Sequence, residues 1–286
     1  MNRHHLVASA LLLACGLSGQ ALAAESYDNC AGYIDALPAT ISTQGVWCLR
    51  QDVATAITDG AAITIATNNV TIDCNHFKIG GLAAGAGTKA TGILANARLN
   101  AVVRHCNVRG FYIGAALSGG GHVIEDNRFN SNYGTGVYLE GDGSVVRRNL
   151  VADTGGSTVS TTAAGIVTAM DVDVIDNTVA SVFVDQGTDR EAYGISASDN
   201  TSGSIRGNRV RNLTTMMTGG SVFGVFNAVS SHVVMKDNHI IGDGSAESTI
   251  GIACADNSGI TRDNVINGFQ TGVDQCAGDG SDVVKL

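Results

Sequence analysis

One short motif, an apolar segment that closes on an asparagine, recurs along most of this chain and constrains its fold more than any other feature. Clear copies are Val-Ile-Glu-Asp-Asn-Arg-Phe at 123–129 and Asp-Val-Ile-Asp-Asn-Thr-Val at 173–179. Successive pivots are 21 to 31 residues apart, and one of them is cysteine. The pivots are Asn75, Cys106, Asn127, Asn149, Asn177, Asn208, Asn238 and Asn264. A motif that returns at such a period predicts a solenoid of stacked units.

Two rows of residues around the pivots predict a corner in every unit. The residues three before the pivot are apolar except Thr261, and the residues two after it are apolar throughout. The two rows are five residues apart, so a straight strand, whose side chains alternate between faces, cannot point both inward. We therefore expect a bend at each pivot. Asparagine tolerates a left-handed backbone there, and its amide is able to hydrogen-bond to its copy in the next coil.

A second row consists of glycines, each followed by a small or branched apolar residue. Its members are Gly92, Gly114, Gly136, Gly165, Gly194, Gly224, Gly251 and Gly272. We expect each glycine to open a coil at a bend. The shortest repeats hold 21 or 22 residues, too few for a strand, a regular helix and turns, whereas three short strands fit. The pattern predicts an all-β parallel β-helix of about eight coils between residues 60 and 275.

The repeat resembles the right-handed parallel β-helix of the pectin-lyase-like superfamily, with repeats of the PbH1 type. That group includes pectate lyases, polygalacturonases, alginate-acting enzymes and NosD-like periplasmic proteins. The right hand is carried over from the family and agrees with the rule for parallel crossovers. The string from Leu37 to Leu49, Leu-Pro-Ala-Thr-Ile-Ser-Thr-Gln-Gly-Val-Trp-Cys-Leu, resembles one with which secreted members open. The resemblance implies a protein that acts on polysaccharide or binds it.

The two ends of the chain depart from the repeat. A charged start, an apolar run from Leu6 to Leu13 and an Ala-Leu-Ala site predict a secretory signal peptide over residues 1–24. The rival interpretation is a lipoprotein signal with anchoring at Cys15. Residues 25–58 are expected to form an N-terminal cap with one irregular strand, and 276–286 an unanchored tail. We expect one domain over residues 25–286, secreted or periplasmic.

Removal of the signal peptide leaves six cysteines, an even number that suits an oxidising compartment. Cys74 with Cys106, and Cys254 with Cys276, occupy similar places in neighbouring coils, which stacking brings close together. Cys30 and Cys48 remain before the first coil. The repeat therefore predicts the disulfides Cys30–Cys48, Cys74–Cys106 and Cys254–Cys276, against the alternative of buried free thiols.

The charge balance limits the partners. Without residues 1–24 the chain keeps 16 basic and 26 acidic residues, a net charge of about −10. Such a charge argues against nucleic acid and anionic membrane surfaces, and the apolar run is too short to span a membrane. We expect a monomer that binds a polysaccharide or cell-surface glycan. No cofactor and no metal site is expected, because calcium-binding and paired-aspartate signatures are absent.

Charged residues beside the pivots form the candidate site. The residues one and two before each pivot place cations, carboxylates and one imidazole together in adjacent coils. The candidate catalytic residues are Arg104, His105, Glu125, Asp126, Arg147 and Arg148; the candidate substrate-binding residues are Tyr133, Tyr138 and Asp176. A uronate lyase or C5-epimerase needs a cation for the substrate carboxylate, a base for the C5 proton and an acid. The alternative is a solvated face of ion pairs.

Two functions are consistent with this sequence: a uronate-polymer lyase or C5-epimerase, or a non-catalytic carbohydrate-binding or structural module. Insertions in the longer coils, at 155–162, 184–191, 214–220 and 242–248, are expected to gather on one side of the rod, which is often the binding side. Because a fold does not determine a function, the geometry of the charged residues has to decide between them.

Overall fold

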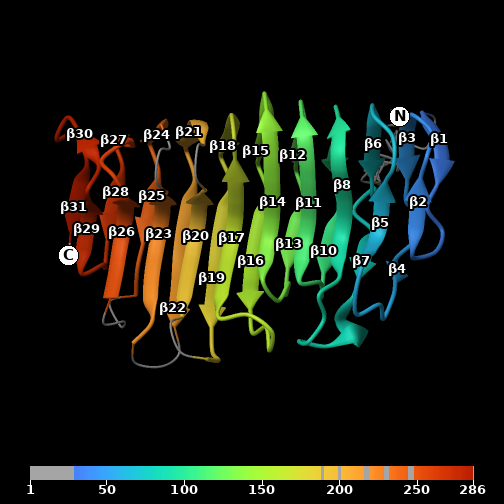
Figure 1. Cartoon of the computed structure of the whole chain (residues 1–286), viewed down its shortest axis with the longest axis horizontal. Coiled ribbons are helices and arrows are strands. Elements are labelled where there is room, and N and C mark those ends of the chain that lie inside the picture. Colours follow the sequence, from blue (N-terminus) through green and yellow to red (C-terminus); the bar gives the residue numbers. More distant parts are fainter. Residues whose placement is uncertain are drawn as a thin grey trace, which may run out of the picture.

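The chain winds into a rod of stacked coils, and each coil contributes one strand to each of three parallel sheets (Figure 1). The computed structural model describes residues 29–187, 190–198, 201–215, 219–228, 232–243 and 248–285. In this part of the chain the sheets, here called A, B and C, hold 11, 10 and 10 strands. The all-β parallel solenoid predicted from the repeat is therefore confirmed.

Sheet A carries the segment before each pivot. In spatial order it consists of β1 (Cys30–Tyr33), β3 (Gly45–Cys48), β6 (Val70–Asp73), β9 (Val102–Arg104), β12 (Val123–Glu125), β15 (Ser144–Arg147), β18 (Val172–Ile175), β21 (Ser202–Arg206), β24 (His232–Lys236), β27 (Ile260–Arg262) and β30 (Ala277–Gly278). Sheet C carries the segment after it, as β4 (Val53–Ala54), β7 (Lys78–Gly80), β10 (Asn107–Arg109), β13 (Arg128–Asn130), β16 (Leu150–Gly155), β19 (Thr178–Val184), β22 (Arg209–Thr215), β25 (His239–Ile241), β28 (Val265–Asn267) and β31 (Val283–Lys285).

Sheet B carries the glycine row and has the longest strands. They are β2 (Ala39–Ile41), β5 (Ala61–Ile65), β8 (Thr91–Leu99), β11 (Ile113–Gly120), β14 (Thr135–Asp142), β17 (Thr162–Ala169), β20 (Glu191–Ala197), β23 (Ser221–Asn227), β26 (Ser248–Cys254) and β29 (Thr271–Asp274). One 3-10 turn, η1 (Leu82–Ala84), lies between sheets C and B. The four long insertions all connect a strand of sheet C to the next strand of sheet B, so they leave the rod at the same corner, as predicted.

The corner between sheets A and C has a different construction from the one expected. The left-handed residue is the one before the pivot, as at His105, Asp126 and Arg148 with φ of 52°, 55° and 55°. The pivot asparagines from Asn127 to Asn264 point inward and are at most 4% exposed. Of the two properties predicted for asparagine, the tolerance of a left-handed backbone applies only at Asn75, with φ of 47°. At the other positions its use is the inward hydrogen bond.

The inward asparagines form the predicted ladder along the rod. The backbone N–H of Cys106 donates to Oδ1 of Asn127 at 2.9 Å, and that of Asn127 donates to Oδ1 of Asn149 at 3.0 Å. The same contact links each pivot to the next as far as Asn264, whose own N–H donates to Asp282 at 2.9 Å. Since buried polar groups are costly unless paired, the ladder allows the chain to bend inside an apolar core.

The glycine row serves close packing and not a bend. Gly114, Gly136 and Gly165 lie inside strands of sheet B without a left-handed backbone. A Cβ on Gly136 would collide with a methyl group of Val151 and with the carbonyl oxygen of Gly165 in the next coil. The expectation that these glycines open each coil at a bend was therefore wrong; glycine is required because neighbouring coils approach too closely for any side chain.

Both ends of the described part of the chain belong to the stack. Residues 30–54 form four strands that pair in parallel within all three sheets, whereas the sequence predicted a cap with one irregular strand. The tail, predicted to be unanchored, forms β30 and β31, which pair with β27 and β28. The coils are therefore more numerous than the eight predicted from the pivots. The predicted signal peptide and Cys15 lie outside the described residues.

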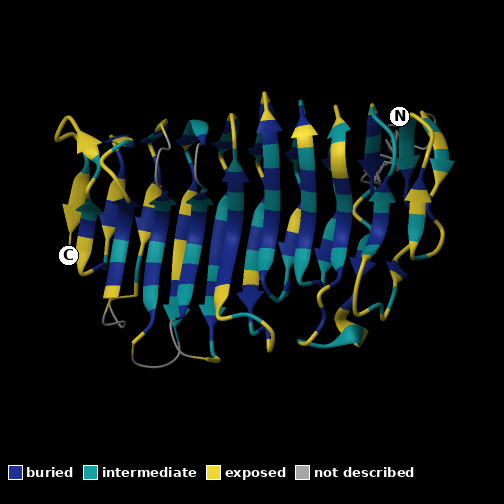
Figure 2. Ribbon diagram, viewed as in Figure 1, coloured by how far each residue is buried: buried dark blue, intermediate teal, exposed yellow. Residues whose placement is uncertain are grey.

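A continuous apolar core runs along the axis of the rod, and buried residues recur in the strands along its whole length (Figure 2). The inner rows predicted from the pivots, such as Ile124, Val146, Phe129 and Val151, are 0% exposed. All three predicted disulfides are present, Cys30–Cys48, Cys74–Cys106 and Cys254–Cys276, with Cα atoms 5.8, 4.7 and 5.0 Å apart. They link neighbouring coils near the two ends of the rod.

Candidate functional site

The six candidate catalytic residues lie together at the corner between sheets A and C. Parallel pairing places Glu125 of β12 between Arg104 of β9 and Arg147 of β15. His105, Asp126 and Arg148 are the left-handed residues that follow these three strands. The structure thus brings the predicted charged patch together, because the same position in successive coils stacks at the spacing of parallel strands.

Most charges in this patch are paired with one another. Arg147 contacts Glu125 at 2.6 Å, and Arg148 contacts both Glu125 at 3.0 Å and Asp126 at 2.7 Å. The hydrogen bond from Arg148 is the largest cause that lowers the pKa of Asp126 below its ordinary value. The same pair raises the pKa of Arg148. Asp126 is therefore held ionised by an arginine whose charge it already neutralises.

Asp73 is the carboxylate partner of Arg104 and His105, the two remaining members of the patch, and the sequence analysis did not single it out. Its carboxylate accepts from Nε of Arg104 at 2.8 Å and lies 3.1 Å from Nδ1 of His105. Burial raises the pKa of Asp73, but the N–H of Asn75, His105 and the charge of Arg104 outweigh it, and the net pKa is lowered. The position of Asp73, two before the pivot Asn75, is the signal that could have found it.

Of the other three predicted residues, the two tyrosines lie away from this patch, and Asp176 continues its corner row one coil beyond Arg148 without an ion pair to the described residues. Tyr138 lies on β14 in sheet B, where its hydroxyl donates to Glu140 at 2.9 Å. Burial, together with Glu140, raises the pKa of Tyr138 to about 12. Tyr133 lies in the connection between β13 and β14, and its backbone N–H donates to the carbonyl of Phe111 at 2.7 Å. Asp176 is exposed at the corner after β18, two coils beyond Glu125, where its carboxylate packs over Gly207.

The outer face of sheet B carries an aromatic cluster that the sequence analysis missed. Tyr193 of β20 stacks on Phe223 of β23, with ring centroids 5.0 Å apart and an interplanar angle of 11°. Phe226 lies 5.5 Å from Tyr193 and 5.3 Å from Phe223. Tyr193 and Phe223 each precede a residue of the glycine row. That offset predicts an outward side chain and could have revealed the pair, because alternate residues of a strand point to opposite faces.

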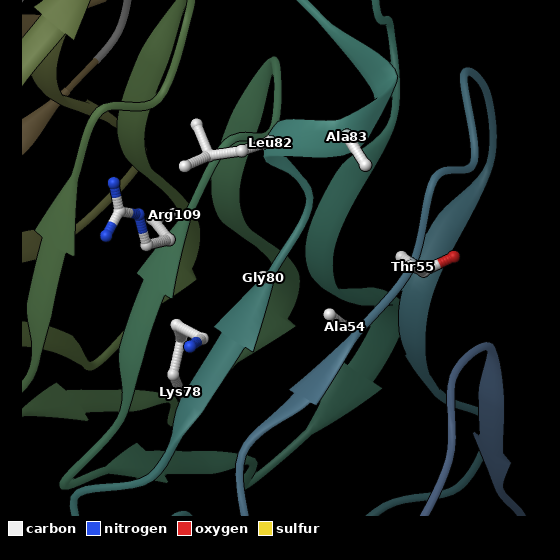
Figure 3. A pocket seen from close by; sticks show the side chains of 7 residues that line it. All are labelled: Ala54, Thr55, Lys78, Gly80, Leu82, Ala83 and Arg109. Atoms are coloured by element: carbon white, nitrogen blue, oxygen red, sulfur yellow. The ribbon is translucent and has the colours of Figure 1, made fainter.

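A hollow of about 130 Å³ lies on the same face, lined by Leu94, Ala116, Ser118, Tyr138 and Glu140 among others. Another, of about 170 Å³, lies on sheet C, with Lys78 and Arg109 on one side and Leu82, Ala83, Ala54 and Thr55 around the rest (Figure 3). A larger recess of about 610 Å³ lies between the loop at 157–161 and Gln186 and Gly187. None of these hollows contains the six charged residues of the predicted patch.

Among the described residues, no group of three or more His, Cys, Asp or Glu side chains could hold a metal ion. In the same part of the chain, no helix is long and apolar enough to cross a membrane.

The comparisons with known proteins agree on the architecture. A family model described as a right handed beta helix region matches residues 91–284. The A-module of the mannuronan C-5 epimerase AlgE4 from Azotobacter vinelandii is similar in structure, with a TM-score of 0.50 and 11% identity over 90% of this chain and 89% of that one. The Dettilon tailspike protein gives a TM-score of 0.49 and 15% identity over 87% of this chain and 62% of that one.

These identities are low enough that the structural similarity shows the fold and not the activity. No curated protein matches the chain by sequence. The family model, however, spans more than half of the chain, and its coils are the ones that the asparagine ladder joins. The protein therefore belongs to the right-handed β-helix family, with the pectin-lyase-like architecture that its repeat resembles.

Proposed function

We propose that this protein is an exported, non-catalytic module that binds polysaccharide on the outer face of sheet B. The observation that carries the proposal is the aromatic cluster of Tyr193, Phe223 and Phe226, which is partly exposed on the flat face of long strands. Aromatic rings offer a large apolar surface with little conformational entropy to lose. The apolar face of a sugar ring fits such a surface, and consecutive coils repeat along the rod as sugars repeat along a polymer.

The carboxylates of this face favour a neutral polymer. Glu191 lies on β20 beside Tyr193 and raises the pKa of that phenol together with burial, which is the larger cause. Glu140 lies two strands away on β14. Carboxylates hydrogen-bond well to sugar hydroxyls but repel an acidic chain. The ligand expected on sheet B is therefore a glycan without charged groups.

The predicted lyase or epimerase is the weaker candidate. An elimination at C5 requires an available base and a cation that is able to engage the substrate carboxylate. In the predicted patch Arg147 and Arg148 already neutralise Glu125 and Asp126. Tyr138, a candidate substrate-binding residue whose hydroxyl could otherwise serve as an acid, has a raised pKa and an internal acceptor, so it holds its proton. Neither the ion-paired residues of the patch nor the hydroxyl of Tyr138 is therefore available as the base, cation or acid of the reaction.

Export is supported by the disulfides. Three cross-links in one domain are typical of proteins that fold in an oxidising compartment. This agrees with the secretory signal peptide that residues 1–24 predict.

The test is binding of the wild type to a panel of neutral polysaccharides, measured by affinity electrophoresis and calorimetry, followed by the double variant Tyr193→Ala, Phe223→Ala. We expect at least tenfold weaker binding for the double variant. Tyr33→Ala is the matched control, because Tyr33 is a partly exposed aromatic residue on β1 in sheet A. Absence of binding to every neutral polymer, or equal loss in the control, would contradict the aromatic site. Release of unsaturated uronates by the wild type would contradict a non-catalytic role.

A further inference from the structure

The outer face of sheet C carries a row of cations that the proposed function does not use. Its members, here called the sheet C strip, are Lys78 of β7, Arg109 of β10, Arg128 of β13, and Arg209 and Arg211 of β22. Each arginine of the strip is next to a buried residue of its own strand, since Val108, Phe129 and Val210 are 0% exposed. Strand alternation therefore directs all five cations outward. They lie on one face of a molecule whose chain has an excess of acidic residues.

Four of the five cations have no ionic partner among the described residues. Among the described residues, the ion pairs of the strip are limited to Lys78 with Asp52, at 2.8 Å. Arg109, Arg128, Arg209 and Arg211 take part in none of the ion pairs formed by those residues. In the predicted patch, by contrast, Arg104, Arg147 and Arg148 each contact a carboxylate within 3.0 Å. The arginines of that patch are therefore neutralised, whereas four cations of the strip form no ion pair with the described residues.

Polar atoms without partners lie in the same strip. Oδ1 of Asn107, Oδ1 of Asn130 and Nε of Arg109 are shielded from solvent and have no hydrogen-bond partner. Parallel pairing sets Asn107 beside Arg128 and Asn130 beside Arg109, so these four side chains form one block. The block offers acceptors for hydroxyl groups and donors for anionic groups, the two kinds of group that alternate along an acidic sugar chain.

A hollow and an apolar wall lie beside this block. Lys78 and Arg109 line one side of the hollow of about 170 Å³, and Leu82 of η1 forms part of its rim (Figure 3). Leu82 is 42% exposed, so its apolar side chain is open to a ligand in the hollow. An apolar rim beside a few placed polar groups is the common construction of a small-ligand site. It suits a sugar ring that carries an anionic substituent.

We propose that the sheet C strip binds an acidic polysaccharide whose chain runs along the rod. Lys78, Arg109 and Arg128 lie on three consecutive strands. Lys78 and Arg128 share one register two strands apart, at roughly 10 Å, and Arg109 lies two residues farther along the strand between them. A guanidinium recognises a carboxylate or sulfate through two parallel hydrogen bonds. The overall excess of acidic residues disfavours DNA and anionic membranes, which carry a dense and extended charge. This site is separate from the aromatic cluster, which lies on another sheet.

The test compares three double variants that remove the same charge. Arg109→Ala with Arg128→Ala, and Arg209→Ala with Arg211→Ala, alter the strip; Arg147→Ala with Arg148→Ala alters the paired arginines of sheet A. Binding is measured by calorimetry at low and moderate salt, with polygalacturonate and heparin as probes for carboxylate and sulfate. Dextran serves as the neutral control polymer. Circular dichroism and thermal unfolding establish that each variant is folded.

We expect the two strip variants to bind at least one acidic polymer tenfold more weakly or worse, with a smaller dependence on salt, while the sheet A variant keeps wild-type affinity. The double variant Tyr193→Ala, Phe223→Ala should retain this binding, which separates the strip from the proposed neutral site.

Equal weakening in all three double variants would show a net-charge effect and overturn the proposal. Absence of wild-type binding to both acidic polymers would overturn it too, as would equally tight binding to duplex DNA or anionic vesicles. If the Arg109 and Arg128 variant does not fold, Arg128→Lys, which keeps the charge and loses the bidentate geometry, provides the same comparison.

Discussion

Oδ1 of Asn177 accepts two hydrogen bonds from Asn149 of the preceding coil, one from the backbone N–H at 2.9 Å and one from the side-chain amide at 3.0 Å. The amide of Asn177 in turn donates to the carbonyl of Val146 at 3.0 Å and to Oδ1 of Asn208 at 3.1 Å. One buried side chain therefore satisfies groups in three successive coils. The corner between sheets A and C depends on this sharing, because its asparagines are buried.

The substitution Asn177→Ala should destabilise the fold strongly. It leaves the backbone N–H of Asn149 without its acceptor in a buried corner and removes one of the three acceptors of the Asn149 side-chain amide. An unpaired buried group costs about 1–3 kcal/mol. We expect the free energy of unfolding to fall by about 2–4 kcal/mol, measured by denaturant titration. Asn267→Ala is the control, since Asn267 is exposed at the end of β28, and it should change stability by less than about 0.5 kcal/mol. Similar losses in both variants would contradict the role given to the ladder.

The substitution Gly194→Ala should also destabilise, although Gly194 has no left-handed backbone. A Cβ there would collide with the carbonyl oxygen of Gly224 and a methyl group of Val210. Overpacking of this kind costs about 1–3 kcal/mol. Gly80→Ala is the matched control, because the nearest atom to its Cβ would lie at 3.5 Å, and it should be neutral in thermal unfolding. If the two variants melt at the same temperature, close packing is not the reason for the glycine row.

His122 should make stability sensitive to pH near neutrality. The side chain is 0% exposed, and burial lowers its pKa below the ordinary value of 6.5, against smaller opposing effects of backbone hydrogen bonds. As the pH falls below about 6.5, His122 is protonated in the unfolded chain but stays neutral in the folded chain. Stability is therefore complete above that pH and is lost as the pH falls toward the lower pKa of the folded state.

The measurement is the free energy of unfolding at pH 7.5 and pH 5.5. The wild type should lose stability between the two, and His122→Gln should lose less, whatever its absolute stability. His239→Gln, at an exposed position on β25, should follow the wild type. An equal loss in all three proteins would assign the pH dependence to other groups.

Glu125→Gln should have little effect on stability and none on glycan binding. Glu125 pairs with Arg147 and Arg148, whose side chains are 40% and 48% exposed, and such surface pairs contribute about 1 kcal/mol or less. The difference from the wild type should shrink further at high salt, where surface charges are screened. Thermal unfolding at two salt concentrations and the binding assays above check this. A large loss of binding or of any turnover would restore the predicted patch as the functional site.

Much of the architecture could be predicted because it repeats. The Asn127-to-Asn264 pivots recur at one place in each coil, and stacking then implies both the ladder and the disulfide between Cys74 and Cys106. The wrong predictions concern why a residue type recurs. The left-handed residue is Asp126 and not Asn127, and glycine is needed at 136 to prevent a collision, not to make a bend. A sequence row shows that a residue type is needed, but only coordinates show which atoms it meets.

The repeat period and its two apolar rows determined that this chain forms a parallel β-helix, since no straight strand or regular helix could bury both rows. Only the tertiary structure decided which charges are available. Arg147 and Arg109 look alike in sequence, but stacking gives the first an ion pair with a carboxylate, whereas the second forms none with the described residues. The physical reason is that charge availability depends on neighbours in adjacent coils, some 20 to 30 residues away, and on the sheet that each residue faces.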